Sequence, residues 1–318
     1  MDKNYYEIAQ KIKNEIKIVV LGKDEVINKI LASTLAGGHV LLDDIPGVGK
    51  TTLALAFSKA TSMDYRRLQF TPDVLPTDVT GFTIYDKKTD SFQYKEGVAF
   101  CNLFLADEIN RTSSKTQSAL LELMEEGKVT VDGVEHPMPD PYVVIATQNP
   151  IGSVGTQMLP DSQLDRFMIC VSMGYPSVED EVAILKDRQD KNPLQFVDAV
   201  ADENDIKAMR EIVKNVYTHD RIYDYIAAIA DETRKNDMFK LGLSPRGSLT
   251  LARIARAVAF LNGRDFVIPD DIAYIFRDVA AHRVVLSPKA KISGQSIDDI
   301  LKSVLDKVPA PKLSQGRI

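Results

Sequence analysis

The residues with the clearest chemistry lie between positions 40 and 52, where Gly47 and Gly49 are followed directly by Lys50 and Thr51. Glycines let successive backbone N–H groups curl around an anion. Lys50 can then reach the β- and γ-phosphates of a nucleotide, and the Thr51 hydroxyl can bind Mg²⁺. This spacing therefore indicates a site for a magnesium-bound nucleotide.

The elements on either side of these glycines fit a phosphate-binding loop. Residues 40–42 form a short apolar run that predicts a buried strand, and residues 53–59 predict a helix. Such a helix points its positive N-terminus at the bound anion. We expect the nucleotide to contact Gly47, Val48, Gly49, Lys50, Thr51 and Thr52.

One position departs from the general pattern G-x-x-x-x-G-K-[ST], because Asp44 stands where that pattern has glycine. Aspartate tolerates a left-handed backbone better than most residues, so we expect the turn to form. The alternative interpretation is an ordinary strand-to-helix turn with a chance Gly-Lys-Thr sequence.

Two adjacent carboxylates, Asp107 and Glu108, end a second apolar run that begins at Asn102. Ligands of an α/β sheet sit at the carboxyl ends of its strands. We therefore expect Asp107 to approach the Mg²⁺ held by Thr51, and Glu108 to polarise an attacking water. Two solvated acids at a strand end are the alternative, which the nearby phosphate loop disfavours.

A third apolar run begins at Tyr142 and ends in polar residues at Asn149. At the carboxyl end of a strand, Asn149 can orient a water molecule or contact a γ-phosphate. The alternative is an asparagine that only forms a turn before Pro150.

Arg246 follows Ser244 and Pro245, which are well suited to the N-cap and first position of a helix. A cation in the first helical turn is disfavoured by the helix dipole, by roughly 0.3–1 kcal/mol. The position of Arg246 at that helix end therefore indicates that an anion approaches it. A surface arginine paired with a nearby acid is the alternative.

The N-terminal part alternates helices and strands. Helices are predicted over residues 8–18 and 24–35, with Asp24 as N-cap, and over 116–126; strands are predicted over 65–70 and 168–171. The turn at residues 19–22 is a possible wall for an adenine ring. Residues 82–85 and 91–94 predict one hairpin, and residues 129–135 predict another, because Asp132-Gly133 favours a type I′ turn.

From Gly174 onward the pattern is almost entirely helical, with helices predicted at about 177–185, 205–216, 221–235, 245–261, 270–282 and 296–308. We therefore predict an α/β nucleotide-binding domain over residues 1–174 and a helical domain over 175–318. This length suits about two domains.

Composition limits the classes of partner and compartment. The chain of 318 residues carries a net charge of −6 without a dense Lys/Arg block, which argues against nucleic acid as the main partner. Two cysteines predict no disulfide framework and fit a reducing cytosol. No apolar run has the length of a membrane span, no signal peptide is recognised, and the four histidines lack the spacing of a zinc site.

Taken together, these motifs resemble those of the MoxR-family AAA+ ATPases, along nearly the whole chain. The resemblance rests on six stretches: 46–51, 68–73, 105–111, 146–150, 163–167 and 244–246. It implies an α/β P-loop AAA+ domain, with a parallel sheet flanked by helices and hairpin insertions, followed by an all-α lid domain.

The resemblance also implies roles for the residues of the sheet edge. Lys50 and Thr51 match the Walker A motif. Asp107 and Glu108 match Walker B, and Asn149 matches sensor 1.

Two arginines receive roles from the resemblance alone. Arg166 matches the arginine finger that acts on the ATP of the neighbouring subunit, and Arg246 matches sensor 2. Arg111, just after Walker B, is the main competitor for the role of finger.

The resemblance further implies Mg²⁺-dependent ATP hydrolysis in the cytoplasm by a ring, usually a hexamer. The ring would remodel or mature client proteins, often with partners that carry a von Willebrand factor A domain. One alternative is a nucleic-acid remodelling motor. Such a motor needs a basic channel, which the net negative charge of the chain disfavours. Another is a non-hydrolysing ATP-binding switch, which the presence of Glu108, Asn149 and Arg166 disfavours.

Overall fold

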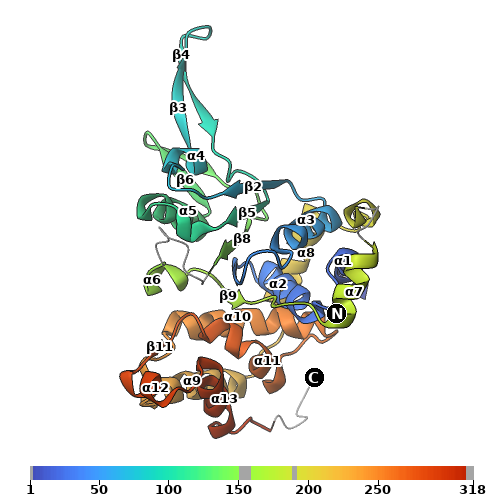
Figure 1. Cartoon of the computed structure of the whole chain (residues 1–318), viewed down its shortest axis with the longest axis vertical. Helices are drawn as coiled ribbons and strands as arrows, with labels where there is room; N and C mark the ends of the chain where they lie inside the picture. Colours follow the sequence, from blue (N-terminus) through green and yellow to red (C-terminus); the bar gives the residue numbers. More distant parts are fainter. Residues whose placement is uncertain (1–2, 150–158, 188–191, 313–318) are drawn as a thin grey trace.

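The computed structural model describes residues 3–149, 159–187 and 192–312 (Figure 1). Its centre is a five-stranded parallel sheet in the order β2-β5-β8-β1-β9. The strands are β1 (Val40–Asp43), β2 (Tyr65–Gln69), β5 (Leu103–Asp107), β8 (Val143–Gln148) and β9 (Ile169–Val171). This confirms the predicted parallel sheet, and its order brings the carboxyl ends of β1, β8 and β5 next to one another.

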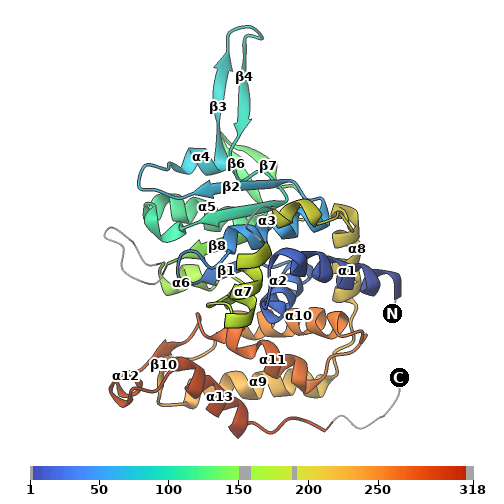
Figure 2. The same cartoon turned by 45° about the vertical axis from the view of Figure 1, so that its right-hand side comes forward.

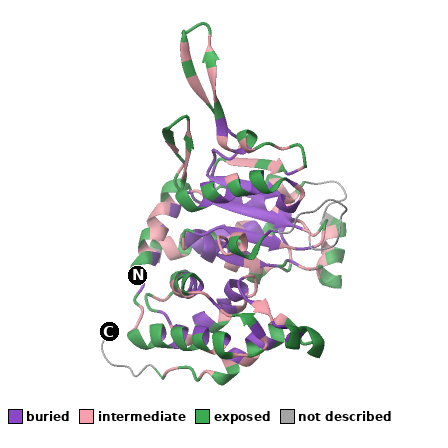
Figure 3. Ribbon diagram, turned by 90° about the vertical axis from the view of Figure 1, so that its left-hand side faces the viewer, coloured by how far each residue is buried: buried purple, intermediate pink, exposed green. Residues whose placement is uncertain are grey.

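Hydrophobic side chains leave the central strands alternately on both faces. Leu103, Leu105 and Ile145 belong to one core cluster, while Phe104 and Val144 belong to another. Successive side chains of a strand point to opposite faces, so each face needs its own covering layer. Figure 3 shows the buried sheet between these layers.

Helices supply those layers. The first cluster includes residues of α1 (Lys3–Val19), α2 (Asp24–Leu35) and α3 (Lys50–Thr61), and the second includes residues of α5 (Ser114–Glu126). The N-cap predicted at Asp24 is wrong: Lys23 occupies that position, and Asp24 is the first helical residue, where it pairs with Lys17 at 2.6 Å. An acidic side chain in the first turn still interacts favourably with the helix dipole.

Both predicted hairpins are confirmed. The strands β3 (Gly81–Asp86) and β4 (Ser91–Glu96) extend away from the body, beyond α4 (Pro76–Thr80), at the top of Figure 1. A shorter hairpin joins β6 (Lys128–Val131) to β7 (Val134–Pro137). The positive φ angles of Asp132 (50°) and Gly133 (80°) are those of the predicted type I′ turn.

The C-terminal half is mainly helical, as predicted. A long helix with one buried face, α10, contacts α2, α8, α9 and α11 (Figure 2). The elements of this half are α7 (Val178–Asp187), η2 (Pro193–Phe196), α8 (Glu203–Lys214), α9 (Asp220–Lys235), α10 (Pro245–Leu261), α11 (Pro269–Ala280), α12 (Pro288–Ser293) and α13 (Ile297–Lys307). The prediction missed the short antiparallel pair β10 (Phe239–Leu241) and β11 (Val285–Leu286), which have too few residues to show an alternating pattern.

The two halves meet in one hydrophobic cluster, which runs from α1–α3 into α8–α11. Residues 172–177 form the irregular connection between β9 and α7, where the sequence predicts the boundary between residues 1–174 and 175–318. Because the core is continuous across it, this division stays a prediction. Both cysteines are free thiols. No helix in the described ranges is long and apolar enough to cross a membrane.

Candidate functional site

The loop between β1 and α3 has the conformation that a phosphate-binding loop requires. Gly47 and Gly49 have φ angles of 86° and 95°, in the left-handed region that favours glycine. Gly49 is the N-cap of α3, and Lys50 is the first helical residue. The predicted order of strand, glycine loop and helix is therefore confirmed, with a helix N-terminus directed at the loop.

The Lys50 ammonium is anchored at the base of this loop. Its Nζ donates to the backbone oxygen of Asp44 at 2.7 Å and to Oδ1 of Asn149 at 3.1 Å. Burial lowers the pKa of Lys50, and the charges of Asp44 and Asp107 partly oppose that effect. The lysine is thus held between the end of β1 and the end of β8, where a phosphate would meet it.

Asp44 has a different role from the one that the sequence suggests. It is not among the four described non-glycine residues with positive φ, so left-handed tolerance is not what keeps it here. Its buried carboxylate instead accepts hydrogen bonds from the amides of Met173 and Gly174 and from the hydroxyl of Ser172. Asp44 therefore ties the phosphate loop to the connection that leads into α7.

The predicted metal ligand Asp107 is buried at the end of β5. Its Oδ1 accepts a hydrogen bond from the Thr147 hydroxyl at 2.6 Å, and its Oδ2 lies 2.6 Å from Nη2 of Arg67. Neither partner is predicted from the sequence. Thr147 lies near the carboxyl end of β8, which is a signal that the sequence offers, whereas Arg67 lies in the middle of β2 and carries no such signal.

Glu108 is held in a fixed position beside Asp107. Its φ of 59° is left-handed, an uncommon backbone conformation of the kind that concentrates at functional sites. Asn149 donates to its Oε1 at 2.9 Å, and Arg111 lies 2.6 Å from its Oε2. Burial favours the neutral carboxyl, but hydrogen bonds from Arg111 and Gln69 outweigh burial and lower the pKa of Glu108.

These contacts form a continuous row at the carboxyl edge of the sheet, from Lys50 through Asn149 to Glu108. Asn149 bridges the other two with the two ends of its amide, so it does more than form a turn. Pro150, which the alternative interpretation of Asn149 invoked, lies outside the described residues.

A cavity of about 320 Å³ lies beside the phosphate loop. One wall is the predicted turn with Val20 and Leu21, another is Gly47 in the loop, and a third includes Met173 and Tyr175. The predicted adenine-side turn and the phosphate loop therefore face the same space.

The two remaining predicted arginines meet each other at a different place. Arg166 Nε and Arg246 Nη1 contact the two oxygens of Glu125, at 2.8 and 3.1 Å. Arg246 also lies 3.8 Å from Asp165, which pairs with Arg283 at 2.6 Å. The structure brings Lys50 to Asn149 but gives both arginines carboxylate partners elsewhere, so their roles remain predictions.

The helix that carries Arg246 begins as predicted. Ser244 is the N-cap of α10 and accepts a hydrogen bond from the amide of Gly247 at 3.1 Å, with Pro245 in the first helical position. Arg246 thus lies in the first turn, with about half of its side chain exposed.

Comparison with known proteins gives two family matches. Residues 39–169 match the family model "ATPase family associated with various cellular activities (AAA)", and residues 231–304 match the model "AAA lid domain". The first range contains the phosphate loop, both carboxylates and Asn149, and the second contains Arg246.

Several relatives match nearly the whole chain. The uncharacterized protein YeaC of Bacillus subtilis is 45% identical over 96% of both chains. The chaperone MoxR1 of Mycobacterium tuberculosis is 38% identical over 94% of this chain and 81% of its own. A solved crystal structure, of a candidate ATPase from Cytophaga hutchinsonii, superposes with a TM-score of 0.90 at 35% identity, over 97% of this chain and 96% of the other.

Proposed function

Because this chain belongs to the MoxR family of AAA+ ATPases, we propose that it hydrolyses ATP with Mg²⁺ in a ring assembly and uses the energy to remodel client proteins. The observation that carries the proposal is the row Lys50–Asn149–Glu108 beside the phosphate loop. The row holds an ammonium group, an amide and a carboxylate side by side, which supports a phosphate-binding, a positioning and a proton-accepting role for them. Hydrolysis of a bound phosphoanhydride needs these three groups together.

Substrate binding uses the loop and its cavity. The phosphates of ATP lie against the loop amides and the N-terminus of α3, with Lys50 neutralising their charge. The purine occupies the mainly apolar space between Val20, Leu21 and Tyr175.

Thr51 and Asp107 are the residues that would hold Mg²⁺. The fit is chemical: Mg²⁺ prefers hard oxygen ligands and is usually bound through one or two carboxylates together with substrate phosphates and water. When bound, the ion would neutralise charge on the phosphates. Arg67 neutralises Oδ2 of Asp107 in this structure, so a cation there competes with Arg67.

The side chains at the edge of the sheet then divide the chemical work. Glu108 has a lowered pKa, so it is ionised at neutral pH and can accept a proton from the attacking water. Asn149 fixes the direction of that carboxylate through its 2.9 Å hydrogen bond. Lys50 stabilises negative charge that moves toward the leaving phosphate.

Arg166 completes the site in the proposal, as the finger that a neighbouring subunit supplies. Its guanidinium is only partly buried, and among the described residues its ion pair is with Glu125, which has no part in the proposed chemistry. Arg111 is the weaker candidate because its ion pair is with Glu108, the proposed proton acceptor of its own chain. Arg246, which shares Glu125, would act as sensor 2.

A chaperone-like role follows from similarity, since MoxR1 is named a chaperone. We include a hexameric ring, a cytoplasmic location and a client or partner with a von Willebrand factor A domain in the proposal. Remodelling of nucleic acid is the less favoured alternative, because the net charge is −6.

Nucleotide binding can be tested by thermal unfolding with and without saturating ATP-Mg. A ligand at 100 times its Kd stabilises by about 2.7 kcal/mol, which corresponds to a Tm increase of roughly 5–10 °C. Lys50→Ala is expected to lose this increase. Lys59→Ala, in the last turn of the same helix, should keep it. Equal Tm values with and without ATP in the wild-type chain would contradict the proposal.

A further inference from the structure

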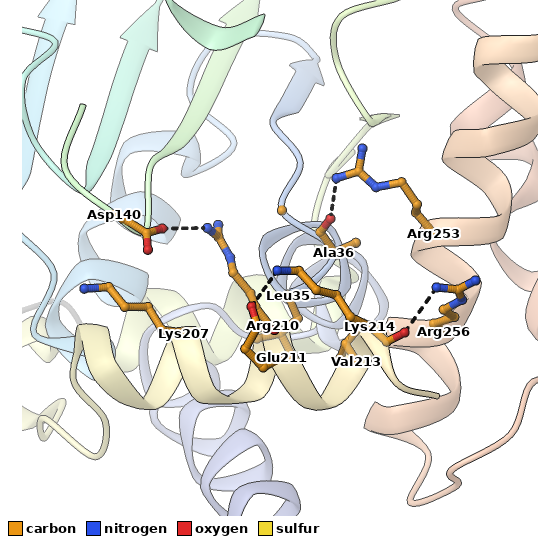
Figure 4. A pocket seen from close by; sticks show the side chains of 11 residues that line it. Leu35, Ala36, Asp140, Lys207, Arg210, Glu211, Val213, Lys214, Arg253 and Arg256 are labelled. Carbon is orange, nitrogen blue, oxygen red and sulfur yellow. Dashed lines mark hydrogen bonds and ion pairs between the residues drawn. The ribbon is translucent and has the colours of Figure 1, made fainter. Parts of the chain in front are cut away.

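A second cavity, of about 270 Å³, lies where the two halves of the chain meet (Figure 4). Its walls come from the end of α2 with Gly37, from Asp140, and from α8 and α10. Gly37 precedes β1 and Asp140 precedes β8, whereas the phosphate loop follows β1. The cavity therefore lies at the amino edge of the sheet, opposite the proposed ATP site.

Positive charge is concentrated around this cavity. Figure 4 shows Lys207, Arg210 and Lys214 on α8, and Arg253 and Arg256 on α10. The lining contains only two carboxylates, which leaves a formal surplus of three positive charges in a chain whose net charge is −6.

Those two carboxylates are already engaged. Glu211 pairs with Lys214 at 2.5 Å, and Asp140 lies 3.6 Å from Nη1 of Arg210. The remaining three cations, Lys207, Arg253 and Arg256, have no carboxylate partner among the described residues. Their charge is therefore uncompensated within the part of the chain that the structure describes.

Structural hydrogen bonds explain only part of this arrangement. Arg210 and Arg253 donate to the backbone oxygens of Thr34 and Ala36, at the C-terminal end of α2. Such bonds satisfy helix-end carbonyls. Neutral carbonyls do not balance the charge, however, and no described residue forms a hydrogen bond or ion pair with the Lys207 ammonium.

Arg210 shows the imbalance most directly. Its side chain is only 14% exposed, and its buried Nη2 has no hydrogen-bond partner among the described residues. Burial lowers the pKa of Arg210, Asp140 opposes this change, and Arg253 adds to it. Asp140 contacts only Nη1 of Arg210, so the buried Nη2 is left without an acceptor, which is costly unless one is close by.

We propose that this cavity binds a small, multiply charged phosphate anion, and that the anion joins α8 and α10 to the end of α2. Guanidinium groups match phosphate oxygens in geometry and charge. The volume is near the lower end of the roughly 300–1,000 Å³ of small-ligand pockets, which suits a short phosphate chain. A free polyphosphate and the phosphates of a nucleotide share this chemistry.

The test uses the full-length Lys50→Ala chain, in which the proposed ATP site is disabled. Tripolyphosphate is titrated by calorimetry without Mg²⁺, into this chain and into a chain that also carries Lys207→Gln and Arg253→Gln. We expect one bound anion per chain, and an affinity at least about tenfold lower in the cavity variant, since the two substitutions remove charge-assisted hydrogen bonds to the anion. Arg253→Lys, which keeps the charge, should lose less.

A matched control removes the same charges elsewhere. Lys302→Gln with Arg234→Gln removes one exposed lysine and one exposed arginine that donates to a single backbone oxygen, as Arg253 does. This control should bind tripolyphosphate like its Lys50→Ala parent.

A titration with ADP in place of tripolyphosphate distinguishes the two sources of phosphate. If ADP binds with the same affinity as tripolyphosphate, the cavity takes the phosphates of a nucleotide. If ADP binds much more weakly, the cavity takes a free phosphate chain. No binding at millimolar tripolyphosphate, or equal loss in cavity and control variants, would overturn the proposal. Because all chains lack Lys50, neither result depends on whether the protein hydrolyses ATP.

Discussion

Replacing Asp44 with glycine, the residue of the general phosphate-loop pattern, should destabilise this protein. Asp44 is 5% exposed, and its carboxylate accepts from three backbone amides, those of Ile45, Met173 and Gly174, as well as from the Ser172 hydroxyl. Asp44→Gly removes the acceptor for all four donors at once.

The magnitude follows from the donors left behind. A buried donor without a partner costs about 1–3 kcal/mol. With three amides affected, and some access for water to them, we expect Asp44→Gly to lower the free energy of unfolding by about 3 kcal/mol. At 2–4 °C per kcal/mol for a chain of this size class, Tm should fall by roughly 6–12 °C. Asp44→Asn keeps one carbonyl acceptor and should cost less.

A double-mutant cycle with Ser172→Ala isolates the contact. In the wild-type background, Ser172→Ala should cost about 1 kcal/mol, because it deletes one hydrogen bond to Asp44. In the Asp44→Gly background that partner is already absent, so the same change should cost almost nothing. The measurement is urea unfolding followed by circular dichroism. An equal cost of Ser172→Ala in both backgrounds, or an Asp44→Gly chain as stable as wild type, would refute the reasoning.

Two further predictions concern assembly and pH. Arg166→Ala and Lys50→Ala should each be inactive alone, since an arginine finger contributes roughly 10³–10⁵ in rate. Mixing the two variants should restore part of the ATPase activity. Normal activity of assembled Arg166→Ala would make Arg111 the first candidate for the finger. Burial, with Arg210 and Arg253 adding to it, lowers the pKa of His39 to about 4, so this buried ring is neutral in the folded state. The stability that comes from the neutral ring is complete above the ordinary pKa of about 6.5, and about 3 kcal/mol of the free energy of unfolding is lost as pH falls to about 4. In urea unfolding, His39→Gln should flatten this part of the profile of stability against pH. An unchanged profile would contradict the assignment.

The local parts of the site could be predicted from the sequence because each lies within one short segment. The glycine loop with Lys50, the strand that ends at Asp107 and Glu108, and the Ser244 cap all depend on neighbours in the chain. The structure confirms their positions.

The rest of the site depends on contacts between distant segments. Asp44 meets Gly174, 130 positions away, and Asp107 meets Arg67, 40 positions away. Neither pairing follows from hydrophobic periodicity or from a motif. The meeting of Arg166 with Arg246 on one carboxylate also needs α5 and α10 to be close, which only the tertiary fold decides.

ATP turnover by Glu108→Gln, measured beside ATP binding, tests the central claim most directly. The substitution keeps the shape of the side chain but removes the proposed proton acceptor. We predict Mg²⁺-dependent hydrolysis by the wild-type chain, and a Glu108→Gln chain that binds ATP equally well but hydrolyses it about 10²–10⁴ times more slowly. Glu126→Gln, an exposed glutamate at the end of α5, should match wild type. Wild-type turnover in Glu108→Gln, or no hydrolysis by the wild-type chain at any protein concentration, would contradict the account.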